Sequence, residues 1–337
     1  MRVDVHWHHV PPLFVESVLR GTCPIAGQLE RDGDEAMVVL DTGFSYRLSA
    51  HGKSSDPAQA VAHMDEVGLD VIAPSISPPL MHHRADVEVA VRVSQVINDG
   101  FAEMAASHDG RFRPLANLPM QDPAAAVAEL RRAVVELGFP GAAIGTHVSG
   151  RNPGEEDFRP FWRAVAELDA FVFLHPVPPS LGSKDRLSGH GRPNFVGLPV
   201  DTAAALASLM FEGVYEEVGT LKTCFAHGGG AFPYILGRWE HGYRARLEPK
   251  GHPTKNPFAY LDSVYADSLT HSDAALRFLV ETLGPDHVCL GSDYPADMGV
   301  SDANAVMERA IEDEATREQV GGTTATNLLG LEVPARP

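Results

Sequence analysis

The chain has 337 residues, with 27 Lys and Arg against 45 Asp and Glu, so its formal net charge is −18. This balance disfavours binding to nucleic acid or to an anionic membrane, since both need clustered positive charge. Apolar residues make up 44% of the chain, and no uninterrupted apolar run is long enough for a membrane span. The first residues lack a cationic start followed by an apolar stretch, and the three cysteines have no C-x-x-C spacing. We therefore expect a cytoplasmic globular protein.

Short apolar runs alternate with amphipathic stretches along the whole chain, a pattern typical of parallel sheets built from β–α units. The expected strands are residues 2–5, 71–75, 112–118, 141–145, 171–175, 221–227, 264–267 and 288–293. The expected helices are residues 57–67, 87–107, 123–137, 155–168, 201–212, 231–246, 271–283 and 301–313.

This alternation predicts an α/β fold of the (β/α)8 TIM barrel type, as one domain over residues 1–337. A doubly wound open sheet is the competing fold, and it is disfavoured because no G-x-G-x-x-G follows the first strand. Residues 9–56 have little periodicity, so we expect a long insertion after the first strand. The Gly- and Pro-rich residues 178–199 are expected to form a loop above the fifth strand.

Polar side chains gather at the ends of four predicted strands, which is where a barrel builds its active site. His6 and His8 end the first strand, and residues i and i+2 of an extended segment point to the same side. His175 ends the fifth strand, His227 ends the sixth, and Asp293 ends the eighth. Imidazole and carboxylate groups are the usual ligands of a catalytic zinc-type ion. Together these residues predict a metal site.

Each of these residues also has a purely structural explanation. A single His-x-His pair is a weak signal, and His175 could be a core or loop residue. Asp293 could cap the following turn, and the three glycines after His227 could form only a connection between strand and helix. All of these residues lie at the same end of the predicted strands, and this coincidence favours the metal site. A metal-binding or scaffolding protein without catalysis is another alternative, and it would have a closed coordination sphere and no open pocket.

The motifs VDVHWHH, FLHP, HGGGAFPYILGR and LGSDYP, in this order, resemble those of the amidohydrolase superfamily, in particular its aminocarboxymuconate-semialdehyde decarboxylase-like branch (amidohydrolase family 2). The resemblance covers essentially the whole chain. It implies that one divalent metal is bound by His6, His8, His175 and Asp293. It also implies that His227 acts as the general acid/base. The His-rich ligand set favours zinc, with manganese as the alternative.

The resemblance further implies two arginines that bind a substrate carboxylate. Arg238 matches the arginine that, in the family, reaches into the neighbouring subunit's site, which implies a homodimer. Arg47, which precedes Asp56-Pro57, is a loose counterpart of the second arginine. Arginine binds carboxylates in a bidentate manner, so the expected partner is a small-molecule carboxylate substrate. The fourth strand ends without the lysine that bridges two ions in binuclear relatives, so a single metal is expected.

From these residues we expect a metal-dependent, non-oxidative decarboxylase of a small unsaturated or aromatic carboxylic acid. A bound divalent ion lowers the pKa of its water from about 15.7 towards 7. Asp293 would ligate the ion and accept a hydrogen bond from that water, while His227 would transfer protons. The alternative is a metal-dependent hydrolase or hydratase of a small amide, lactone or enol acid, because the fold alone does not decide the function. An acid-binding Arg238 favours an acid substrate, and so decarboxylation or hydration.

Overall fold

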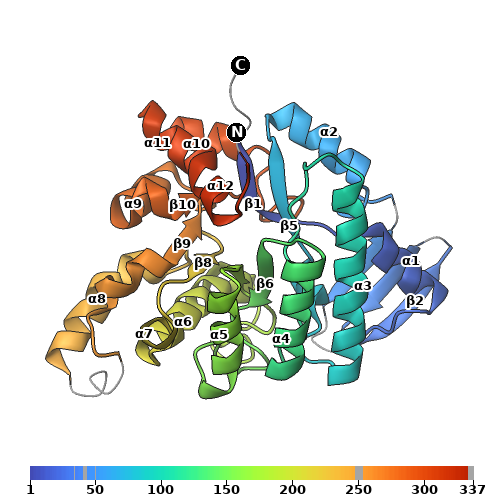
Figure 1. The fold of residues 1–337 in the computed structure, drawn as a ribbon, viewed down its shortest axis with the longest axis horizontal. Coiled ribbons are helices and arrows are strands. Elements are labelled where there is room, and N and C mark those ends of the chain that lie inside the picture. The colour runs from blue at the N-terminus through green and yellow to red at the C-terminus, as the bar shows by residue number, and fades with distance from the viewer. Residues whose placement is uncertain (34, 41–43, 50, 247–252, 333–337) are drawn as a thin grey trace.

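The structure is a computed structural model, and it describes residues 1–33, 35–40, 44–49, 51–246 and 253–332. Parallel strands form a (β/α)8 barrel with helices packed around the outside (Figure 1), which confirms the fold predicted from the alternation. The buried apolar residues form one continuous cluster that includes residues from the barrel strands and the surrounding helices.

The barrel strands follow the predicted positions closely. They are β1 (Val3–His8), β5 (Val71–Ser75), β6 (Gly141–Gly145), β7 (Phe171–His175), β8 (Lys222–Phe225), β9 (Val264–Asp267) and β10 (Val288–Cys289). Strands β6 to β10 pair in parallel in that order, and β1 pairs in parallel with β5. The barrel closes between β10 and β1, where Val5 N donates to Leu290 O over 3.0 Å and Asp293 N donates to His6 O over 2.7 Å.

The third predicted strand, residues 112–118, is an extended segment rather than a regular strand. Isolated parallel bridges join it to β5 on one side and to β6 on the other. Pro74 lacks the N–H that β5 would donate to this segment, and Pro114 lacks the N–H that the segment would donate to β6, so neither ladder is continuous. The barrel wall is therefore present here but irregular.

The predicted helices are also present. They are α2 (Pro57–Val67), α3 (Val87–Ala106), α4 (Pro123–Arg131), α5 (Arg159–Glu167), α6 (Leu198–Phe211), α8 (Phe232–Ala245), α9 (Asp273–Leu283) and α10 (Ala303–Ala310), with the short helices α7 (Val214–Val218), α11 (Glu314–Glu318) and α12 (Thr324–Leu328). Helix α2 has the expected bounds, α6 is longer than expected, and the other predicted helices are shorter, with α4, α5 and α10 the most shortened. Aspartate caps open several of them: Asp56 accepts from Ala58 N and Asp122 from Ala124 N, both over 2.9 Å.

The predicted loop at residues 178–199 is only partly irregular. A helical turn at Pro193–Gly197 leads directly into α6, which therefore begins earlier than expected. The stretch Pro193–Phe211 is long and apolar enough by composition to cross a bilayer, but half of it is buried inside the protein. This burial is the pattern of a helix that packs on a core.

The segment between β1 and β5 is more regular than its weak periodicity suggests. It contains α1 (Pro12–Arg20) and an antiparallel sheet of β2 (Gln28–Asp32), β3 (Glu35–Val39) and β4 (Ser45–Ser49). Figure 1 shows these elements beside α3, to one side of the barrel. Alternate residues of β3 are buried, including Val38, and in β4 Leu48 is enclosed while its neighbour Arg47 is exposed. Strands of five residues leave too few repeats for such alternation to stand out in the sequence.

Strand β1 directs alternate side chains to its two sides, as its sequence predicts. Trp7 packs outward against Tyr294, with 4.5 Å between the ring centroids. His6 and His8 point the other way, into the barrel, where they approach Asp293.

Candidate metal centre

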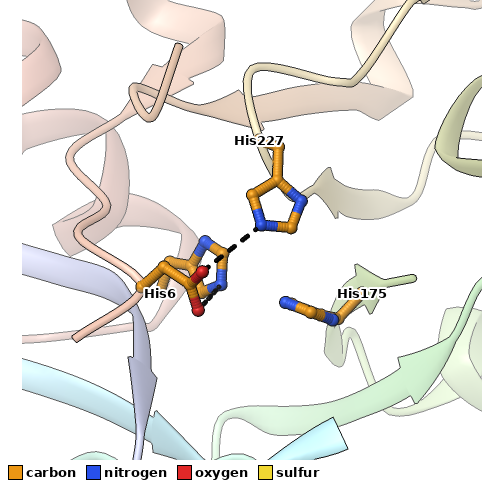
Figure 2. A group of neighbouring side chains, drawn as sticks. His6, His175 and His227 are labelled. Atoms are coloured by element: carbon orange, nitrogen blue, oxygen red, sulfur yellow. Dashed lines mark ion pairs between the residues drawn. The ribbon is translucent and has the colours of Figure 1, made fainter. Parts of the chain in front are cut away.

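Five side chains predicted from the sequence converge at the carboxyl end of the barrel strands, and Figure 2 shows three of the histidines facing one another. The ring of His6 lies 5.0 Å from that of His175 and 5.1 Å from that of His227, between centroids. The ligand atoms of His6, His175, His227 and Asp293 all lie within 4.8 Å of one another. His8 Nε2 completes the group, at 2.9 Å from Asp293 Oδ1.

Four of these side chains carry a buried atom that makes no hydrogen bond of acceptable geometry in the part of the chain that the structure describes, although Asp293 Oδ1 lies 3.1 and 2.9 Å from two of the imidazole nitrogens. The atoms are Nε2 of His6, His8 and His175, and Oδ1 of Asp293. Unpartnered buried polar atoms are costly, so four of them gathered at one place require a common partner. Three imidazole nitrogens and one carboxylate oxygen form a donor set that suits a divalent metal ion. These residues therefore fit a divalent metal.

The electrostatics of the site also favour a cation. Burial opposes a charge on His6, but the carboxylates of Asp293 and Asp267 outweigh it and raise the pKa of His6 to about 10. Burial lowers the pKa of His8 and of His175, so both imidazoles are neutral and each can offer a lone pair. A positive charge close to the two carboxylates therefore stabilises them, and a metal ion can supply this charge in place of the proton on His6.

The turn after β8 holds His227 in an unusual conformation. His227 has φ 58°, and the glycines at 228–230 also have positive φ, a region that side chains disfavour. A Cβ atom at Gly230 would lie 2.3 Å from Pro199 O, so the close packing requires glycine there as well. Asp293 shares the positive φ of 58°. Strained backbone at two facing polar residues points to a functional constraint.

Asp267, at the end of β9, is a site residue that was not expected. Its Oδ2 accepts a 2.5 Å hydrogen bond from His6 Nδ1, and its two oxygens accept from the backbone N–H groups of His227 and Gly228 at 2.9 and 2.7 Å. One buried carboxylate thus orients His6 and the turn that carries His227. The sequence contains the signal that could have identified it, because Asp267 ends a predicted strand just as Asp293 does.

The two predicted substrate arginines lie outside the site of this chain. Arg47 is 62% exposed on β4 and pairs with Glu35 of β3 over 2.6 Å, while its neighbour Tyr46 faces the cavity. Arg47 therefore faces away from the cavity of this chain, since a one-residue step along a strand reverses the face, and its role in substrate binding stays a prediction. Arg238 lies on the exposed side of α8 and is not part of the cavity wall among the described residues.

A cavity of about 1170 Å³ opens above the ligands, and His8, His175, His227 and Asp293 form part of its wall. The remaining wall is largely apolar, with many prolines that make it rigid. Cavities of this kind are typical of small-molecule sites. An open cavity over the ligand group disfavours a closed, purely structural metal site.

Known proteins share this architecture. The family model described as amidohydrolase matches residues 3–331. A 2-amino-3-carboxymuconate-6-semialdehyde decarboxylase from Dictyostelium discoideum is 33% identical over 98% of this chain and 92% of its own length. A gamma-resorcylate decarboxylase from Rhodococcus jostii is 30% identical over 80% of this chain and 86% of its own. The crystal structure of a dihydroxybenzoic acid decarboxylase from Polaromonas sp. JS666, with bound manganese and the inhibitor 2-nitroresorcinol, is 26% identical with a TM-score of 0.78, covering 98% of this chain and 96% of that one. The chain belongs to the amidohydrolase family.

Proposed function

We propose that this protein is a metal-dependent, non-oxidative decarboxylase of a small aromatic or unsaturated carboxylic acid. The observation that carries the proposal is the group of buried, unpartnered ligand atoms on His6, His8, His175 and Asp293 beside an apolar cavity. The relatives named as decarboxylases support it, because they match this chain over most of its length.

In this proposal His6, His8, His175 and Asp293 hold a single divalent ion, which when bound supplies a Lewis acid for a substrate oxygen. We infer zinc as the resident ion because three of the four ligands are imidazoles. Manganese is the competing ion, since it is bound in the relative from Polaromonas sp.. His227 is left out of the ligand set because its Nε2 lies farther from Asp293, 3.5 Å from Oδ2, and its side chain is 19% exposed.

His227 then acts as the proton donor of the reaction. It gives a proton to the carbon that bears the carboxylate, and the bond from that carbon to the carboxylate breaks. The electron pair of this bond restores the unsaturated system, and carbon dioxide leaves. Solvent replaces the proton on His227 through its exposed edge. The apolar cavity walls favour decarboxylation, because the substrate carboxylate loses more solvation free energy there than neutral carbon dioxide does.

We also infer that the active unit is a homodimer in which Arg238 serves the cavity of the neighbouring subunit. Arg238 lies one helical turn after Tyr234, which is 86% exposed and lines the mouth of the cavity. Within the described ranges Arg238 has no acidic side chain at ion-pair distance. An unpaired arginine beside the mouth is free to bind a carboxylate across an interface.

The test is turnover of a panel of aromatic and unsaturated acids, including 2,6-dihydroxybenzoate, by zinc-loaded and manganese-loaded protein. We expect carbon dioxide release in step with loss of at least one acid, and its abolition by a chelator. Hydrolysis of amides or lactones by the loaded protein, without carbon dioxide release from any acid of the panel, would contradict the proposal.

A further inference from the structure

The charged side chains of the cavity point to the kind of substrate that it takes. Among the described residues of its wall, the basic side chains other than histidine are Lys53 and Lys184, and the acidic ones are Asp293 and Asp297. No arginine is present in this part of the wall. Asp293 belongs to the candidate metal group, so away from that group the two lysines face the single carboxylate of Asp297, and this excess of positive charge favours an anionic occupant.

The backbone of Lys53 is fixed above the end of β1. The carbonyl of the next residue, Ser54, accepts a 2.6 Å hydrogen bond from Val10 N, two residues after His8. The turn closes on itself as well, because Ser55 N donates to Gly52 O over 2.9 Å and the Ser55 hydroxyl donates to a backbone carbonyl of β4. Lys53 therefore extends from a pinned turn next to the strand that supplies two candidate metal ligands.

Three hydroxyl groups line the same cavity as Lys53. Tyr46 Oη lies 3.2 Å from Ser54 Oγ and 2.9 Å from Ser77 Oγ, and all three residues line the cavity. Hydroxyls can donate to an anionic oxygen while a lysine ammonium supplies the charge. Within the described ranges no acidic group lies at ion-pair distance from Lys53, whereas Arg47 is already neutralised by Glu35.

We propose that Lys53 is the residue that binds an anionic group of the substrate, and that it selects acids with a second anionic oxygen group away from the metal. The inference rests on the proposed function, in which one carboxylate is directed to the metal centre and His227. Lys184, from the loop between β7 and α6, supplies further positive charge on the same cavity wall.

The test uses two simple probes, benzoate and isophthalate, which differ by one carboxylate. Their dissociation constants are measured by titration calorimetry on zinc-loaded wild type, Lys53→Ala, Lys53→Arg, Lys184→Ala and the control Lys255→Ala, which changes an exposed lysine outside the cavity wall. We expect wild type and the control to prefer isophthalate by about 10- to 100-fold, the usual weight of a charge-assisted hydrogen bond. Lys53→Ala loses most of this preference with little change for benzoate, and Lys53→Arg retains part of it.

Equal affinities of wild type for the two probes, or an unchanged preference in Lys53→Ala, would overturn the inference. A preference lost only in Lys184→Ala would overturn it too. The same experiments distinguish a failure of the Lys53 inference from a failure of the proposed function. If isophthalate binding depends on Lys53 but no acid releases carbon dioxide, the decarboxylase proposal fails and the role of Lys53 stands. If acids are decarboxylated with the same kcat/KM by wild type and Lys53→Ala, the role of Lys53 fails and the decarboxylase stands.

Discussion

His6 and Asp267 are joined by a 2.5 Å hydrogen bond from Nδ1 to Oδ2, and both side chains are fully buried. The bond fixes the imidazole with its Nε2 towards Asp293, 3.1 Å from Oδ1. The same carboxylate accepts the backbone N–H of His227. A single residue of β9 therefore positions a candidate ligand on β1 and the candidate acid/base after β8.

Replacing Asp267 by Asn removes the negative charge that holds His6 in place. We expect Asp267→Asn to fold and to bind its metal about 10- to 100-fold more weakly, which is the usual effect of losing a partner that orients a ligand. Competition with a chelator measures the affinity. Asp262→Asn, an exposed carboxylate shortly before β9, is the matched control. Wild-type metal affinity in Asp267→Asn would show that the hydrogen bond does not support the site.

Two histidine variants separate the ligand role from the proton-transfer role. His227→Ala should retain its metal and lose turnover by about 10²- to 10⁴-fold, the usual contribution of a proton-transfer group. His8→Ala should lose metal as well, because the buried Nε2 of His8 is a proposed ligand. Metal analysis and carbon dioxide release on both proteins provide the check. The reverse pattern, with metal lost only in His227→Ala, would exchange the two roles.

The cross-subunit role of Arg238 predicts a loss of activity without loss of metal. Arg238→Ala should lose most turnover, whereas Arg244→Ala on the same helix, where Arg244 pairs with Glu240 over 3.0 Å, should not. Mixing Arg238→Ala with His227→Ala should restore up to about a quarter of wild-type activity, because each mixed dimer of the expected twofold assembly regains one intact site. Full activity of Arg238→Ala, or no recovery after subunits have exchanged, is the result that would rule this role out.

The buried His83, which lies outside the metal centre, predicts that the protein loses stability in acid. Burial, together with the neighbouring His147 and His82, lowers the pKa of His83 to about 3. Between pH 6.5 and pH 3 the unfolded chain binds a proton here that the folded chain does not. The free energy of unfolding therefore falls by about 1.4 kcal/mol per pH unit of acidification from this group alone.

Urea unfolding between pH 7 and pH 4 measures this slope. His83→Leu should have a shallower dependence than wild type, because leucine does not titrate. His241→Asn, which changes an exposed histidine of α8, should keep the wild-type slope. Identical slopes for wild type and His83→Leu would show that His83 is not held neutral by its surroundings.

The barrel and most of the metal centre could be predicted because both depend on local patterns. Period-two alternation placed His6 and His8 on one side of β1, and the strand-end position brought in His175, His227 and Asp293. The structure gathers these five side chains within one group. The irregular third strand was beyond such patterns, since it depends on the neighbouring strand to which Pro74 and Pro114 would each have had to donate an N–H.

The cavity wall could not be predicted, because it depends on contacts between distant segments. Arg47 matched a family motif, yet the pairing of β3 with β4 places it opposite Met37 and next to Glu35, on the exposed face. Lys53 carries no motif, and its place beside β1 follows from contacts such as the hydrogen bond from Val10 N to Ser54 O, between segments distant in the sequence. The register of this hairpin places Tyr46, and not Arg47, on the cavity wall.

Metal content per chain, measured by elemental analysis on wild type and Asp293→Ala side by side, tests the central claim most directly. One divalent ion, held by His6, His8, His175 and Asp293, predicts close to one zinc per chain in wild type and a sharp reduction in the variant. Close to two ions per chain in wild type, no metal even after reconstitution, or an unchanged content in Asp293→Ala would contradict the account.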